Sequence, residues 1–88
     1  MKISTKIRKL LAIDYIEPAI DELEIYVKDN DIPHYNQVLK VSGEYYHLEG
    51  ENKSGVISKH DYKKLVKRVR NKILKIANEL DLGNRATA

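Results

Sequence analysis

The sequence lacks cysteine, tryptophan and phenylalanine altogether, and it holds only four glycines and two prolines in 88 residues. Without cysteine there is no disulfide framework, no thiolate metal site and no cysteine nucleophile, which fits a reducing compartment. So few turn residues exclude a many-stranded β sandwich. The chain also has no apolar run of the roughly 18 to 20 residues that a membrane-spanning helix needs. We therefore expect a cytoplasmic protein with no membrane association.

The residues that are present favour a folded helical domain. Hydrophobic residues make up 42% of the chain and charged residues 33%, a composition too apolar for disorder. A chain of this length supports one domain with one modest core and excludes a two-domain enzyme. We place the helical domain at residues 1–82 and expect residues 83–88 to form a flexible tail or the start of a linker.

The first third of the chain predicts two helices. Apolar residues recur with a helical period from residue 4 to residue 13, and Ser4 or Thr5 is available as the N-cap. Pro18 suits the first turn of a helix, so a second helix is expected at residues 17–30.

The remaining two thirds predict two longer helices. Pro33 opens a helix that extends to residue 52, and Gly55 stops it. Ser58 and Asp61 form a variant capping box for a fourth helix, which we expect to end at residue 82 with Gly83 as its stop. The predicted fold class is all-α, a small antiparallel bundle of four main helices.

The helix at residues 33–52 is expected to be the central one, because its apolar arc is nearly 180° wide. That arc collects Tyr35, Val38, Leu39, Val41, Tyr45, Tyr46 and Leu48. Gly43 and Gly50 share one edge of this helix, where we expect the close approach of another helix, with a local kink as the alternative. Glu49 lies within the arc, and we expect its carboxylate to reach a lysine or arginine of the fourth helix.

Residues that could support catalysis or bind a cofactor are few. His34, His47 and His60 lie thirteen residues apart, and none has a second histidine at the spacing of a zinc-binding helix. No glycine-rich phosphate loop occurs. The sequence therefore predicts no enzyme, no cofactor and no metal site.

Charge is sorted along the chain far more strongly than the net value of +3 suggests. Residues 14–31 hold seven acidic residues and one base, Lys28, whereas residues 59–75 hold eight bases and one acid, Asp61. Two solvated helix faces would account for this pattern. A basic fourth helix could also bind nucleic acid phosphates, which is our alternative function, although the acidic helix would repel a polyanion.

Two apolar residues lie outside the predicted core stripes and within these charged blocks. Ile25 is placed among acids of the second helix, and Leu74 among bases of the fourth. An apolar centre with a charged rim is typical of a contact surface, and the two rims have opposite signs. The candidate interaction residues are Asp21, Glu22, Ile25 and Asp29 on the acidic side, and Lys63, Lys67, Arg70 and Leu74 on the basic side.

A longer pattern resembles a known family. It begins upstream with Ile16, Glu17, Ala19, Ile20 and Leu23. It continues with Asn36, Gln37, Val38, Leu39 and Val41. Its specific part runs from Ser42 through Tyr45, Leu48, Gly55 and Ile57 to Ser58. It continues through Tyr62, Arg68, Val69, Ile73, Leu74, Ile76, Ala77, Glu79 and Leu80. Over about residues 7–80 the chain resembles the effector-associated domain of type eleven.

This resemblance implies a small, death-like helical adaptor of bacterial conflict and defence systems, without catalytic residues. Such domains are fused to effectors or sensors, including caspase-like or trypsin-like peptidases, TIR domains and signalling NTPases. The implied partners are copies of the same domain type, on this protein itself as a homo-oligomer or on such fused proteins.

Overall fold

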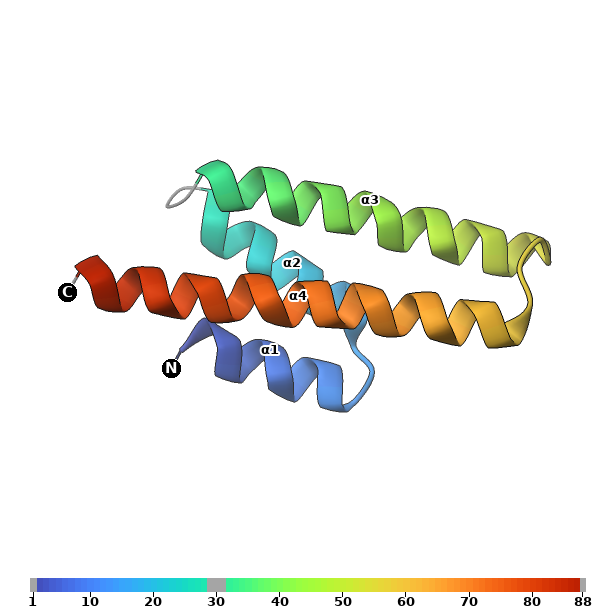
Figure 1. Ribbon diagram of the computed structural model, residues 1–88, viewed down its shortest axis with the longest axis horizontal. Helices are drawn as coiled ribbons and strands as arrows, with labels where there is room; N and C mark the ends of the chain where they lie inside the picture. The colour runs from blue at the N-terminus through green and yellow to red at the C-terminus, as the bar shows by residue number, and fades with distance from the viewer. Residues whose placement is uncertain (1, 29–31, 88) are drawn as a thin grey trace.

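The computed structural model describes residues 2–28 and 32–87, with only the backbone described at residues 32 and 83–87. Four helices follow one another as α1 (Ile3–Ala12), α2 (Ile16–Lys28), α3 (Ile32–Ser54) and α4 (Lys59–Thr87). Successive helices run in opposite directions, and no strand occurs among the described residues (Figure 1). The predicted all-α antiparallel bundle is confirmed.

The bundle is elongated because its helices differ in length. α3 and α4 continue side by side beyond the ends of α1 and α2, while the start of α1 and the end of α4 share the opposite end (Figure 1). The principal extents are 47 × 23 × 16 Å and the radius of gyration is 13.6 Å. A compact domain of this length would have a radius of about 12 Å. The hairpin of α3 and α4 thus has flanks that no other described helix covers.

The core draws on all four helices, and α2 and α4 each pack against the other three. The most completely buried large side chains are Ile7, Ile20, Leu23, Val27, Val38 and Ile73. Helix α3, by contrast, packs only against α2 and α4 among the described residues. The expectation that the third helix is central is therefore wrong. Part of its wide apolar arc faces solvent, since Leu39 is 42% and Tyr46 46% exposed.

The two glycines inside α3 do not mark a close helix contact. A Cβ atom added to Gly43 or to Gly50 would meet no atom within 4 Å. The expected close approach at this edge of the helix is wrong, because nothing packs there that a methyl group would displace.

Helices α1 and α3 end in the same way. The N–H groups of Gly55 and Val56 bond to the carbonyls of Asn52 and Glu51. Together with the positive φ of 74° at Gly55, this is a Schellman motif. At the end of α1, the N–H groups of Asp14 and Tyr15 donate to the carbonyls of Leu11 and Leu10, and Asp14 has a φ of 61°. The sequence predicted the stop at Gly55 and the end of the first helix to within one residue, but not the left-handed backbone of Asp14.

Predicted caps were right at α4 and wrong at α1. The N–H of Asp61 donates to Ser58 Oγ over 3.1 Å, as the capping box requires. Ser4, by contrast, lies inside α1, where it is buried and donates to the Asp81 carboxylate of α4. Ser4 therefore connects two helices instead of capping one.

The fourth helix is longer than predicted. It runs to Thr87, five residues beyond Leu82. Gly83 adopts helical backbone geometry there at a cost of about 1 kcal/mol relative to alanine, and no proline follows to interrupt the helix. The expected helix end at Gly83 is wrong.

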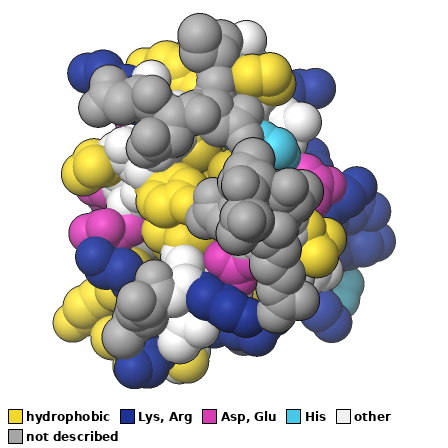
Figure 2. Space-filling view, turned by 90° about the vertical axis from the view of Figure 1, so that its left-hand side faces the viewer, with side chains coloured by type: hydrophobic (Ala, Val, Ile, Leu, Met, Phe, Trp, Pro, Cys, Tyr) yellow, Lys and Arg dark blue, Asp and Glu magenta, His cyan; other side chains and the backbone are white. Residues whose placement is uncertain are grey.

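Charges of both signs mix over much of the surface. At the end that holds both termini, acidic, basic and apolar side chains are interspersed (Figure 2). Ion pairs link neighbouring helices, including Lys6 with Glu22 at 2.8 Å and Lys72 with Glu44 at 2.7 Å. The charge blocks of the sequence are thus partly neutralised within the fold.

Candidate functional site

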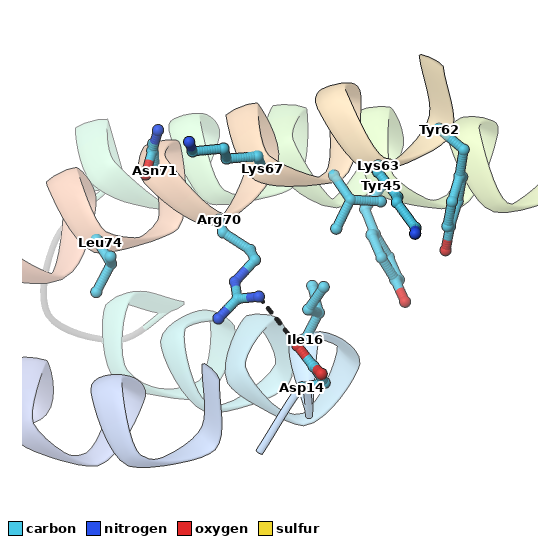
Figure 3. Close-up of a pocket in the computed structure, with 10 residues that line it drawn as sticks. Asp14, Ile16, Tyr45, Tyr62, Lys63, Lys67, Arg70, Asn71 and Leu74 are labelled. Atoms are coloured by element: carbon cyan, nitrogen blue, oxygen red, sulfur yellow. Dashed lines mark hydrogen bonds and ion pairs between the residues drawn. The ribbon is translucent and has the colours of Figure 1, made fainter. Parts of the chain in front are cut away.

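A basic groove of about 670 Å³ lies where the α3–α4 hairpin leaves the four-helix part of the bundle (Figure 3). Most of its lining comes from one stripe of α4, whose members are three or four residues apart and so share a helix face. The connector after α1, the start of α2 and the middle of α3 complete it. Its lining residues are Asp14, Ile16, Tyr45, Tyr62, Lys63, Val66, Lys67, Arg70, Asn71 and Leu74.

All four residues predicted for the basic contact surface line this one groove. Lys63 and Lys67 are exposed, whereas Arg70 and Leu74 are half-buried. Leu74 also packs against the hydrophobic core, so the prediction that it lies off the core is wrong. The groove therefore combines exposed positive charge with an apolar wall that belongs to the core.

Arg70 crosses the groove from α4 to the end of α1 (Figure 3). Its guanidinium donates to Asp14 Oδ1 over 2.9 Å and to the Leu11 carbonyl over 2.8 Å. The first bond holds Asp14, whose backbone is left-handed. The second provides a donor for one of the last carbonyl groups of α1. Arg70 thus has a structural role that the sequence did not indicate, because it lies 56 positions after Asp14.

Tyr45 and Tyr62 line the far end of the groove, and Glu49 of α3 lies beside them. Tyr62 of α4 donates a hydrogen bond to Glu49 of α3. Burial and then the Glu49 carboxylate raise the pKa of Tyr45 to about 12. Burial, followed by the hydrogen bond to Glu49, likewise raises the pKa of Tyr62. Glu49 does reach α4 as expected, but its partner there is a tyrosine hydroxyl, so the expected lysine or arginine is wrong.

The structure does not bring the predicted acidic residues into a surface of one sign. Ile25 is 68% exposed, as expected for a residue opposite the core stripe of α2. It lines a hollow of about 610 Å³ between α1 and α2, whose charged lining residues are Lys2, Lys6, Lys9 and Glu22. Glu22 pairs with Lys6, and Asp29 lies outside the described residues. The described surroundings of Ile25 are therefore mixed in sign, because bases of α1 lie beside it as well as the predicted Glu22.

A different acidic row lies on the α3 side of α2. Glu17, Asp21 and Glu24 follow one another at helical spacing, and we call them the acidic ridge. Tyr46 of α3 lies beside it. Burial, then a hydrogen bond to Glu17, then the charges of Glu17, Asp21 and Glu24 raise the pKa of Tyr46. Sequence reasoning counted these acids but did not group them, although the intervals of four and three residues were a signal for one face.

Within residues 2–28 and 32–87, no group of three or more histidine, aspartate or glutamate side chains is arranged to hold a metal ion. His34 contacts Glu79 and His47 contacts Glu51, each at 3.1 Å. No helix in the part of the chain that the structure describes is long and apolar enough to cross a membrane.

Comparison with known proteins gives one match. A family model described as effector-associated domain 11 matches residues 2–81. Its span includes α1, α2, α3 and most of α4, and therefore both the basic groove and the acidic ridge. No curated protein and no solved structure matches the chain.

Proposed function

The chain belongs to the effector-associated domain 11 family, and from this we propose that it is a non-enzymatic adaptor that binds other copies of the same domain type. The observation that carries the proposal is the extent of the match, which covers nearly the whole bundle. An adaptor of this kind acts through its surface, and a charged groove beside an apolar wall is a suitable contact surface.

The proposed role is to bring an effector and a sensor together in a bacterial defence system. Its partners would be copies of this domain fused to peptidases, TIR domains or signalling NTPases. Linking such modules raises their effective concentration, so even a weak contact between domains becomes productive. We therefore expect the isolated domain to be monomeric when dilute and to associate when concentrated or held on a scaffold.

The experiment is a comparison of free and scaffolded domains. Sedimentation of the isolated chain should show an average mass that rises with concentration. Fusing the domain to both halves of a split reporter should restore reporter signal, and pairing one fused half with one unfused half is the matched control. A constant monomer mass together with reporter signal no higher than the control would contradict the adaptor proposal.

A further inference from the structure

The basic groove presents positive charge that the fold itself does not neutralise. Lys63 and Lys67 form no ion pair among the described residues, and both side chains are exposed. They stand above a wall that includes Ile16, Val66 and Leu74. Desolvated apolar surface with a charged rim is the usual composition of a protein contact.

The acidic ridge presents negative charge that the fold does not neutralise. Glu17, Asp21 and Glu24 form no ion pair among the described residues, in contrast to Glu22 of the same helix. Because α2 buries its other face in the core, this row projects outward. Tyr46, 46% exposed, supplies an aromatic ring beside it.

The two charged rows also match in length. Glu17 to Glu24 covers eight residues of α2, and Lys63 to Arg70 covers eight residues of α4, where Arg70 at the end of the row is already paired with Asp14. At the helical rise, each row is about 10 Å long. Charges on two such rows can face one another when the helices lie side by side, which favours encounter and fixes register.

We propose that the basic groove of one copy of this chain receives the acidic ridge of a second copy. The inference rests on the proposed adaptor function and identifies the surfaces that perform it. Lys63 and Lys67 face Asp21 and Glu24 across the contact, and Tyr46 packs against the apolar wall of the groove.

The surface around Ile25 is not the partner in this arrangement. Lys2, Lys6 and Lys9 line the hollow next to Ile25, and they would repel the lysines of the groove. The acidic ridge lies on the other flank of α2, next to α3, where its own acids determine the local charge.

The test uses two charge reversals and a matched control. The groove variant carries Lys63→Glu and Lys67→Glu, and the ridge variant carries Asp21→Lys and Glu24→Lys. Each should weaken self-association at least about tenfold, because like charges replace opposite ones at the contact. Mixing the two variants should restore association, since one keeps an intact ridge and the other an intact groove.

The control variant carries Lys64→Glu and Arg68→Glu, which make the same change in net charge at exposed bases of α4 outside the groove. It should associate like the unmodified chain. Ile25→Ser should also leave association unchanged. Sedimentation measures association, and circular dichroism melts establish that every variant is folded.

The outcomes separate this inference from the adaptor proposal. If the unmodified chain associates and the groove or ridge variant associates equally well, the assignment of surfaces is wrong while the adaptor function stands. Loss of association in Ile25→Ser would also overturn it by moving the contact to the α1–α2 hollow. Displacement of the second copy by a short DNA duplex would assign the groove to nucleic acid instead. If the unmodified chain neither self-associates nor restores the split reporter, the adaptor proposal itself fails.

Discussion

Two residues with positive φ, Asp14 and Gly55, determine where α1 and α3 end. Glycine adopts this backbone without penalty, whereas most other residues do so only at a cost. Aspartate tolerates it better than most because its short side chain makes local polar contacts. At Asp14 the carboxylate also binds Arg70, so one side chain both ends a helix and anchors it to α4.

The glycines inside α3 give a stability prediction. Gly43→Ala and Gly50→Ala should each raise the free energy of unfolding by about 1 kcal/mol, because alanine is the better helix former and its methyl group meets nothing. Urea denaturation midpoints measure the change. Gly55→Ala is the control and should lower stability by roughly 1 to 2 kcal/mol, since φ is 74° there. A loss of stability at Gly43 or Gly50 would mean that another surface packs on this edge.

The tyrosines at the far end of the groove predict a pH effect. The pKa of Tyr45 is about 12 in the folded chain, against about 10 for an unfolded tyrosine, and the pKa of Tyr62 is also raised. A raised pKa means that the folded state holds the proton more tightly. The stability this contributes is present below pH 10 and is lost as the pH rises from about 10 towards 12.

Glu49→Gln is the matched variant for this effect, because it keeps the shape of the side chain and removes the charge. Tyrosinate absorbance during alkaline titration should then rise at lower pH than in the unmodified chain, since part of the shift in both tyrosines comes from Glu49. Superimposable titration curves would show that the carboxylate does not act on these hydroxyls.

Helix α4 contacts every other helix of the bundle, as α2 also does. Helix α4 is also the longest, at 29 residues. Three polar contacts join α4 to α1 and the connector after it: Ser4 donates to Asp81, Arg8 donates to Asn78 over 3.0 Å, and Arg70 donates to Asp14. Helix α1, only 10 residues long, is thus held to α4 near both of its ends. A helix this short is not stable by itself and depends on such packing.

The contacts of Arg70 predict a local effect of its removal. Arg70→Ala should cost on the order of 1 to 2 kcal/mol, because a charged hydrogen bond to a carbonyl and a partly exposed ion pair are lost together. Amide hydrogen exchange should accelerate in residues 10–15 and stay nearly unchanged in the α3–α4 hairpin. Arg70→Lys keeps the charge but lacks the planar fork that binds two acceptors, so it should recover only part of the loss. Uniformly faster exchange throughout the bundle would contradict a local role at the end of α1.

For the whole molecule, the fold decides which charges remain available to a partner. Glu22, Asp14 and Glu44 are paired with bases of other helices. The acidic ridge and the lysines of the basic groove form no ion pair among the described residues. The fold therefore neutralises part of each charge block, and the acidic ridge and the groove lysines are among the charges that stay without an ion pair in the described residues, as are Lys64 and Arg68 outside the groove.

The two charged surfaces also set the expected strength of nucleic-acid binding, the alternative function. We expect only weak, sequence-independent binding with dissociation constants on the order of 10⁻⁶ to 10⁻⁴ M at physiological salt, because the acidic ridge repels a polyanion. Replacing Lys67 and Arg68 by glutamine should lower the dependence of the binding constant on salt by roughly one unit of slope per lost phosphate contact. Mobility-shift titrations at several salt concentrations measure both quantities. Sub-micromolar binding at physiological salt would favour the nucleic-acid function over the adaptor.

By itself, the sequence determined the helices and most of their ends. The period of apolar residues, the Ser58 cap and the Gly55 stop are features of neighbouring residues, and they act through local backbone geometry. The end of α1 was predicted to within one residue, although the left-handed Asp14 was not. The end of α4 was missed because a helical Gly83 is against the usual preference of glycine.

Only the tertiary structure decided which helix is central and what each charged residue faces. The sequence pattern placed Leu39 in an apolar arc and Leu74 outside the core stripes, yet Leu74 packs against the core and Leu39 is 42% exposed. Arg70 meets Asp14 across 56 residues, and Ser4 meets Asp81 across 77. A helical pattern fixes the direction of a side chain about its own axis, but the neighbour in that direction depends on how the helices pack together.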